Sequence, residues 1–174
     1  MASEGAHSII ARMIGAARLD VHIFEEVEAD TTATRQALSV VALVALATGI
    51  ASWGTGGLVG IVVGIVAAVA GWAIWAWIVY LIGTKILPEP ETHADWGQLA
   101  RTLGFAQSPG ILRVLGVVPV LGEIILFVVF VWMFAAMVIA VRQALDYTST
   151  VRAIGVVLLG FIPYAILLFI AFGI

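Results

Sequence analysis

Long apolar stretches without a charged side chain are the feature that most constrains the fold of this sequence. The stretch at 36–53 is uncharged and about 18 residues long, near the minimum for a helix that crosses ~30 Å of hydrocarbon at 1.5 Å per residue. Hydrophobic residues make up 63% of the 174-residue chain and charged residues only 11%, whereas soluble domains are nearer half apolar and a quarter charged. The sequence therefore predicts an integral membrane protein whose surface faces lipid.

The succession of apolar stretches and helix breakers predicts an all-α bundle of five transmembrane helices over residues 35–174. A glycine-rich turn at 52–57 is expected after the first helix, with Trp53 as an interfacial anchor. The second helix ends in aromatic residues suited to the headgroup region, shortly before Lys85. Four of the five helices have predicted boundaries at 36–53, 58–83, 123–140 and 153–174.

The third helix has two possible geometries. Asp95 and Gln98 form the pattern of a capping box, so a helix is expected to begin there. A serine and a proline then interrupt the apolar stretch before Arg113. Either an interfacial helix ends near 107 and a short half-span follows at 109–119, or one kinked helix spans 99–119 with Arg113 facing other helices.

Residues 1–34 form a polar arm that lacks the features of a secretory signal and is expected to be retained in the cytoplasm. Apolar residues at spacings of three and four predict an amphipathic helix on the membrane surface. Arg12 and Arg18 are expected at the lipid headgroups, whereas the later part of the arm is acidic. The apolar stripe consists of Ile10, Met13, Ile14, Ala17, Val21, Phe24 and Val27.

The distribution of lysine and arginine predicts the orientation, because these residues are enriched in cytoplasmic loops. With five spans, every basic residue except Arg113 falls on the side of the N-terminus. A four-span alternative would fuse 114–141 into one helix and move Arg142 and Arg152 to the far side. We therefore expect five spans, a cytoplasmic N-terminus and an external C-terminus.

Three segments resemble the membrane domain of bacterial Yip-family proteins. They are ARLDVHIFEEVEAD at 17–30 with Ala33, Thr34, Gln36 and Ala37 after it, LARTLGFAQSPGILRVLG at 99–116, and VRQALDYTSTVRAIGVVLL at 141–159. The resemblance implies a five-helix domain with a cytoplasmic N-terminus, here in a bacterial inner membrane. Eukaryotic members of this family assist vesicle traffic by contacting small prenylated GTPases and each other.

Two groups of residues within the predicted spans are candidates for function. Gly56, Gly60 and Gly64 form a ladder along which another helix could approach closely, either within the chain or in a homodimer. Arg113 and Glu123 are the ionisable residues that could lie at membrane depth, where an unpaired charge costs ~3 kcal/mol or more. They could form a proton or ion relay, form a buried structural pair, or extend to opposite interfaces.

The remaining composition limits the kinds of ligand that the chain is expected to bind. The chain has no cysteine, and its three histidines lack the spacing of a metal site, so no cofactor or metal is expected. A net charge of −3 argues against nucleic-acid binding. An acidic run in the arm is either a solvated face or a site for a basic partner; it comprises Glu25, Glu26, Glu28 and Asp30.

These observations favour a non-enzymatic membrane scaffold that contacts lipid and organises partner membrane proteins or further copies of itself. Two alternatives remain open at this stage. The chain could be a small accessory subunit of a larger membrane complex. It could also be a transporter or channel, which would require Arg113 and Glu123 to line a water-filled cavity.

Overall fold

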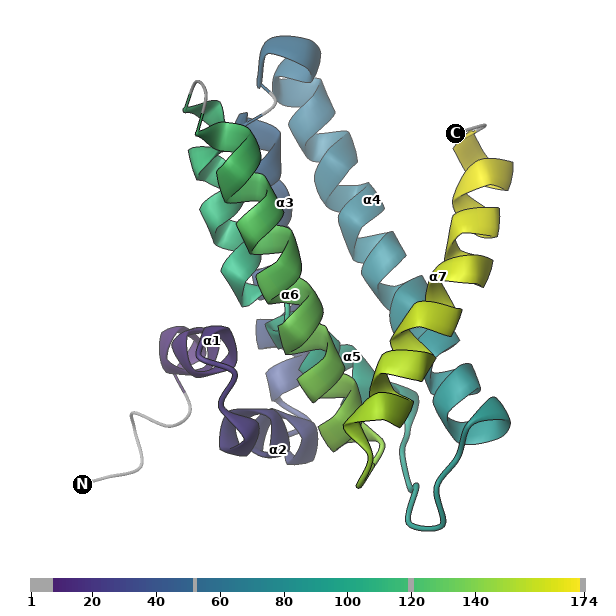
Figure 1. Cartoon of the computed structure of the whole chain (residues 1–174). Helices are drawn as coiled ribbons and strands as arrows, with labels where there is room; N and C mark the ends of the chain where they lie inside the picture. Colours follow the sequence, from purple (N-terminus) through teal and green to yellow (C-terminus); the bar gives the residue numbers. More distant parts are fainter. Residues whose placement is uncertain (1–7, 52, 119–120, 173–174) are drawn as a thin grey trace, which may run out of the picture.

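The computed structural model describes residues 8–51, 53–118 and 121–172, and this part of the chain consists of helices and their connections (Figure 1). The elements follow one another as a short helical arm, a helical hairpin, a pair of short helices and two long helices. In order they are α1 (Ile9–Ala17), α2 (Val21–Ala29), α3 (Ala33–Ala51), α4 (Trp53–Leu81) with its π-helical continuation η1 (Ile82–Ile86), α5 (Trp96–Phe105), the 3₁₀ helix η2 (Ser108–Val117), α6 (Gly122–Ala144) and α7 (Thr150–Phe172).

Four helices in the described part of the chain are long and apolar enough to cross a membrane. They lie in the segments Ala33–Ala51, Gly57–Ile86, Gly122–Ala144 and Thr150–Ile170, with a mean hydropathy of up to 3.1 in α6. Only 11% of the most apolar window of α4 is buried inside the protein. Side chains this apolar and this exposed belong in hydrocarbon, because water would not solvate them favourably.

The third predicted span is replaced by two short elements, α5 and η2. Asp95 caps α5 as expected: its carboxylate accepts a hydrogen bond from the Gln98 amide, and the Gln98 side chain accepts one from the Asp95 amide. Pro109 lies at the start of η2, where its missing N–H and ring prevent the helix from continuing as one regular α-helix. The structure thus has the break near Gln107 that the first of the two expected geometries requires.

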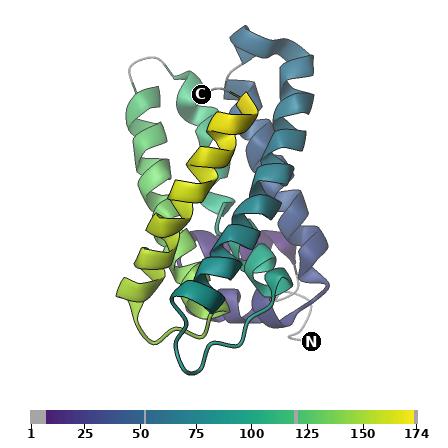
Figure 2. The same ribbon diagram turned by 90° about the vertical axis from the view of Figure 1, so that its right-hand side faces the viewer.

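The short η2 element packs against α3 and α6. A 3₁₀ helix rises about 2 Å per residue, so its 10 residues extend over roughly 20 Å. From the end of α5 the chain therefore runs back along α3 to the end of the bundle where α6 begins (Figures 1 and 2). The described part of the chain thus has four helices of membrane-spanning length and this shorter segment, where five transmembrane helices were expected.

Much of the predicted turn at 52–57 is helical in the structure. The backbone of α4 begins at Trp53 and has one non-helical residue, Gly57, with φ 56°. This left-handed conformation is easily adopted by glycine, which has no Cβ to clash. Ser52, Pro119 and the side chain of Trp53 lie outside the described part of the structure.

The arm forms two helices rather than the single amphipathic helix that its apolar stripe predicted. Leu19 adopts a left-handed conformation with φ 63°, and Asp20 caps α2 by accepting a hydrogen bond from the His22 amide. The turn at Leu19 therefore separates the apolar stripe of the arm into two parts with different surroundings. Phe24 is buried inside the protein, whereas Ile10 is 65% exposed.

The core is concentrated at the arm's end of the bundle. Every residue of α5 from Leu99 to Phe105 is buried, because α5 contacts α2, α3, α4 and α6. At the other end α4 and α7 diverge (Figure 1), and a cavity lined by residues of both helices lies between them. The arrangement leaves a cleft open toward the surrounding membrane.

Candidate functional site

Arg12 anchors the arm to the bundle. Its side chain is fully buried, and Nη2 contacts Glu26 Oε1 at 2.8 Å and Asp30 Oδ2 at 2.6 Å. Nη1 donates to Gln36 Oε1 at 2.9 Å, which joins α1 to α2 and to the start of α3. The expectation that Arg12 lies at the lipid headgroups is wrong, because this residue finds its anionic partners within the protein.

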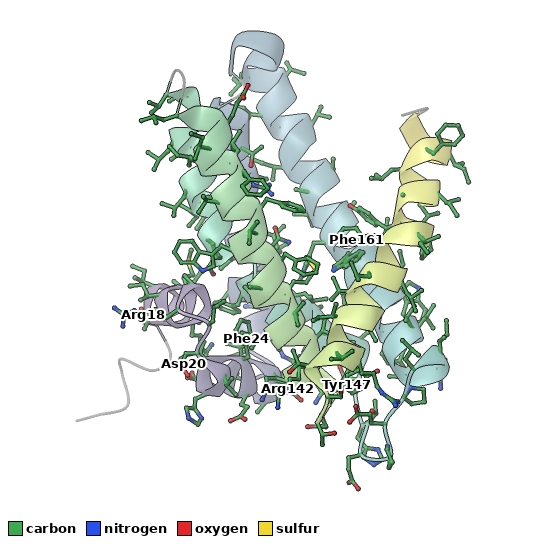
Figure 3. The ribbon with its side chains drawn as sticks, in the orientation of Figure 1. Arg18, Asp20, Phe24, Arg142, Tyr147 and Phe161 are labelled. Carbon is green, nitrogen blue, oxygen red and sulfur yellow. The ribbon has the colours of Figure 1, made fainter. Side chains whose placement is uncertain are left out.

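The contacts around Asp30 shift the pKa of its carboxyl. Hydrogen bonds from Thr32, followed by the hydrogen bond from Arg12, lower the pKa of its carboxyl to about 2. Arg18, by contrast, is exposed and points away from the bundle at the end of α1 (Figure 3). Of the two basic residues assigned to the headgroups, only Arg18 therefore has the exposure which that role requires.

Arg101 on α5 holds the second helix of the arm. Its Nε donates to the carbonyl of Val27 at 3.0 Å, and its Nη2 donates to the carbonyl of Glu28. Both carbonyls belong to the last turn of α2, where the helix leaves acceptors unpaired and where positive charge is favourable. Arg101 is almost fully buried, so it acts as an internal clamp.

Glu28 lies beside this clamp in an unfavourable position for a carboxylate. Its Oε1 accepts a hydrogen bond from Gln98 Nε2 at 2.9 Å. Burial, with a further contribution from the charge of Asp146, raises the pKa of Glu28 to about 7. Glu25 and Asp95 add to this raising effect, while Arg101 opposes it.

The acidic run of the arm thus has two different environments. Glu26 and Asp30 are paired with Arg12, whereas Glu25 is exposed and accepts a hydrogen bond from Gln143 on α6 at 3.1 Å. Glu26 lies in the last turn of α2 and Asp30 directly follows the helix, and their spacing of four residues brings both carboxylates to Arg12. That spacing was a sequence signal for a shared cation, although it could not say which one.

A second set of contacts fixes the loop between α6 and α7. Tyr147 donates its hydroxyl to the carbonyls of Gly83 at 2.9 Å and Leu87 at 2.6 Å. The Glu89 carboxylate accepts hydrogen bonds from Thr148 and contacts Arg152 at 3.4 Å. The hydroxyl and carboxylate therefore join the end of α4 to the start of α7.

Arg113 lines a groove within the membrane-spanning part of the molecule. The groove has a volume of about 300 Å³ and lies between α3, α4 and the α5–η2 segment. We call it the Arg113 groove; it is lined by Val44, Ala45, Thr48, Gly49, Gly60, Gly64, Ala68, Gln107 and Arg113. Glu123 is exposed in the first turn of α6 and is absent from that lining.

Arg113 and Glu123 form no ion pair, and no ion pair to Arg113 is found within residues 8–51, 53–118 and 121–172. The structure therefore does not bring together the two charges that the sequence singled out. It does bring Arg113 next to two residues of the glycine ladder, Gly60 and Gly64.

Gly60 and Gly64 face open space. A Cβ atom added at either position would meet no heavy atom within 4 Å, so no other helix of this chain packs closely on them. The side of α4 at Gly56 lies outside the described part. Close helix contacts are made by other glycines instead: a Cβ at Gly104 would come within 2.7 Å of the Ala37 side chain.

A smaller cavity continues the groove toward the arm's end. It has a volume of about 240 Å³, and its lining includes Ala68 and Gln107, which also line the Arg113 groove. Trp75, Phe161 and Tyr164 form its aromatic wall, with the Trp75 and Phe161 ring centroids 5.0 Å apart where α4 approaches α7 (Figure 3). We call this cavity the tryptophan pocket, and no sequence motif had indicated it.

No group of three or more metal-ligating side chains occurs in the residues that the structure describes. Apart from Arg113 and Glu123, the charged residues of this part lie in the arm, at the start of α3, in α5, or at 85–95 and 142–152. These segments lie together at one end of the bundle (Figures 1 and 3). Apolar spans with a charged, helical end define a polytopic α-helical membrane protein.

Comparison with known families agrees with this class. Residues 21–171 match the family described as the Yip1 domain, and the chain belongs to that family. The match begins at the first residue of α2 and extends through most of α7. No curated protein and no solved structure matches the chain.

Proposed function

We propose that this protein is a non-enzymatic scaffold that organises lipid or partner membrane proteins through its helix surfaces and its arm. The observation that carries the proposal is the fixing of the arm by two buried arginines, Arg12 and Arg101. A surface held in one arrangement loses little entropy when a partner binds, which favours recognition. Membership of the Yip1 family supports a role that does not depend on catalysis.

We further propose five membrane passages in a bacterial inner membrane, with the arm in the cytoplasm and the C-terminus outside. The third passage is assigned to the α5–η2 segment. The support is the clustering of basic residues: Lys85, Arg101, Arg142 and Arg152 belong to segments at the same end as the arm (Figure 1). A transport role is less well supported, because Glu123 does not line the Arg113 groove.

The test is purification of the tagged protein from its own membranes in mild detergent, with the mass of the intact particle and the identity of its companions determined. A scaffold should purify as a monomer or homodimer, with companions in variable amounts. A single complex of fixed stoichiometry would replace the proposal with the role of an accessory subunit.

A variant pair tests whether the arm is the organising surface. Arg101→Gln removes the clamp on α2 and should reduce the recovery of companions that bind the arm. Arg18→Gln removes an exposed charge of the same arm and should leave their recovery unchanged. Equal recovery from the wild type and both variants would contradict the part of the proposal that concerns the arm.

A further inference from the structure

The Arg113 groove holds a cation without an anionic partner in the described part of the chain. Arg113 is half-buried and lines the groove together with residues of α3 and α4, and no acidic residue belongs to that lining. A charge in a membrane interior is costly unless it is paired or hydrated. An anion bound in the groove would therefore pair with the positive charge of Arg113 and remove this cost.

The position of the groove limits where this anion can come from. On α4, Gly60 and Gly64 follow the non-helical Gly57 closely, so at 1.5 Å per residue they lie roughly 5–10 Å along the helix from that kink. The neighbouring outward residues Val63 and Val66 are exposed apolar side chains of a membrane span. An anion at this depth, beside hydrocarbon, is best supplied by a lipid headgroup from the adjacent leaflet.

The open glycines give the groove its width. Among the described residues, no heavy atom lies within 4 Å of a Cβ placed at Gly60 or Gly64, so a headgroup or the start of an acyl chain can lie directly against the backbone of α4. Thr48 and Gln107 supply polar side chains in the same lining. The wall therefore combines charge, polarity and small residues in one place.

The tryptophan pocket supplies the second, independent observation. Trp75 is only 7% exposed, and its indole Nε1–H has no hydrogen-bond partner in the described chain. A hydrocarbon chain supplies no acceptor for this N–H, so the fit of the pocket to an acyl chain depends on its apolar lining. The rest of the pocket, including Leu103, Met133 and Phe161, is apolar and suits a hydrocarbon chain.

We infer that the two adjoining cavities form one binding site for a phospholipid, with its phosphate on Arg113 and an acyl chain running along α4 toward the tryptophan pocket. Charge complementarity selects the phosphate, because guanidinium and phosphate form strong charge-assisted hydrogen bonds. The apolar continuation selects a lipid over a water-soluble phosphate. This inference does not depend on the proposed scaffold role.

The experiment is native mass spectrometry of the full chain in detergent, titrated with phosphatidylglycerol. The wild type should retain phosphatidylglycerol, and Arg113→Gln should reduce the bound fraction about tenfold, as expected for the loss of a charged hydrogen bond. Arg35→Gln, which removes an exposed charge at the start of α3 and outside the groove, is the matched control and should bind as the wild type does. Unchanged binding by Arg113→Gln would overturn the inference.

A second variant tests the groove without touching the charge. Gly64→Leu places a side chain where the protein has open space, so the fold should be kept while the groove is filled. It should lose phosphatidylglycerol as Arg113→Gln does, whereas Val66→Leu on the exposed side of α4 should not. Full binding by Gly64→Leu would show that the phosphate lies outside the groove and would overturn the assignment.

The source of the phosphate is tested with glycerol 3-phosphate, which has the anionic group but no acyl chain. It should fail to displace phosphatidylglycerol at equal concentration. Displacement by glycerol 3-phosphate would identify a site for a soluble phosphate and would contradict a lipid occupant.

Discussion

Single residues decide how the arm is attached. Arg12 and Arg101 carry long charged side chains that are rarely buried, and both are buried here because carboxylates, an amide or main-chain carbonyls accept their hydrogen bonds. Their acceptors come from other elements, separated in the chain by 14 residues for Glu26 and 74 for Val27. The arrangement therefore depends on tertiary contacts.

Arg12→Gln should destabilise the folded protein by about 2 kcal/mol, because Glu26 and Asp30 would lose charged hydrogen bonds. Thermal unfolding in detergent measures the loss, and hydrogen exchange should locate it in α1 and α2. Arg18→Gln is the control for removing a positive charge from the arm. An equal effect of both variants would show that net charge, rather than the buried contacts of Arg12, is responsible.

Glu28 should make stability depend on pH. Its folded-state pKa of about 7 lies above its ordinary value of 4.5, so between these values the folded protein holds a proton that the unfolded chain releases. The contribution of this group to stability therefore falls as pH rises from about 4.5 to about 7, and is constant above that.

Glu28→Gln keeps an acceptor for Gln98 and removes the titration. It should raise the melting temperature at pH 8 by about 3 °C, equivalent to roughly 1 kcal/mol, and have little effect at pH 5. Glu91→Gln, at an exposed position, should change neither value. The same increase at both pH values would contradict the titration of Glu28 as the cause.

Helices pack closely where a glycine faces another helix. The regular spacing of Gly56, Gly60 and Gly64 did not show which glycines have such a neighbour. Gly104 on α5 faces the Cβ and backbone of Ala37 on α3, whereas Gly60 on α4 faces open space. Both are helical glycines, but only one is required by packing. Spacing along one helix cannot reveal whether a second helix is present opposite it.

Gly104→Ala should destabilise the protein by about 1–3 kcal/mol, because its new Cβ would overlap Ala37. Gly60→Ala adds the same methyl group without a clash and should be neutral or stabilising by up to about 1 kcal/mol. Thermal unfolding of the two variants in lipid-free detergent compares them directly. A comparable loss in Gly60→Ala would indicate a contact to another chain at that position.

At the scale of the whole molecule, the α5–η2 segment determines how many times the chain crosses the membrane. It is short, yet it carries the chain from the arm's end of the bundle to the opposite end (Figure 2). Because the natural chain has no cysteine, single cysteines can report the side of each segment.

Five passages place Glu91 and Asp146 on one side of the membrane and Leu121 on the other. A membrane-impermeant maleimide should label Glu91→Cys and Asp146→Cys in inside-out vesicles, and Leu121→Cys in right-side-out vesicles. All three positions are exposed in the folded protein. A cysteine that fails to react is therefore shielded from the maleimide by the membrane and not by burial in the protein. Labelling of Leu121→Cys from the same side as Glu91→Cys would contradict the fifth passage.

The sequence by itself determined the class of the protein, four of the five helices it predicted and the cap at Asp95, and it left the break near Pro109 as one of two geometries. These features are local, because hydrocarbon length, capping chemistry and the missing proline N–H act within a few turns of chain. The tertiary structure alone decided that the arm folds as two helices, that Arg12 is buried, and that Arg113 faces a groove rather than Glu123. Each of these depends on which distant residues supply acceptors, space or an opposing surface, and no local pattern carries that information.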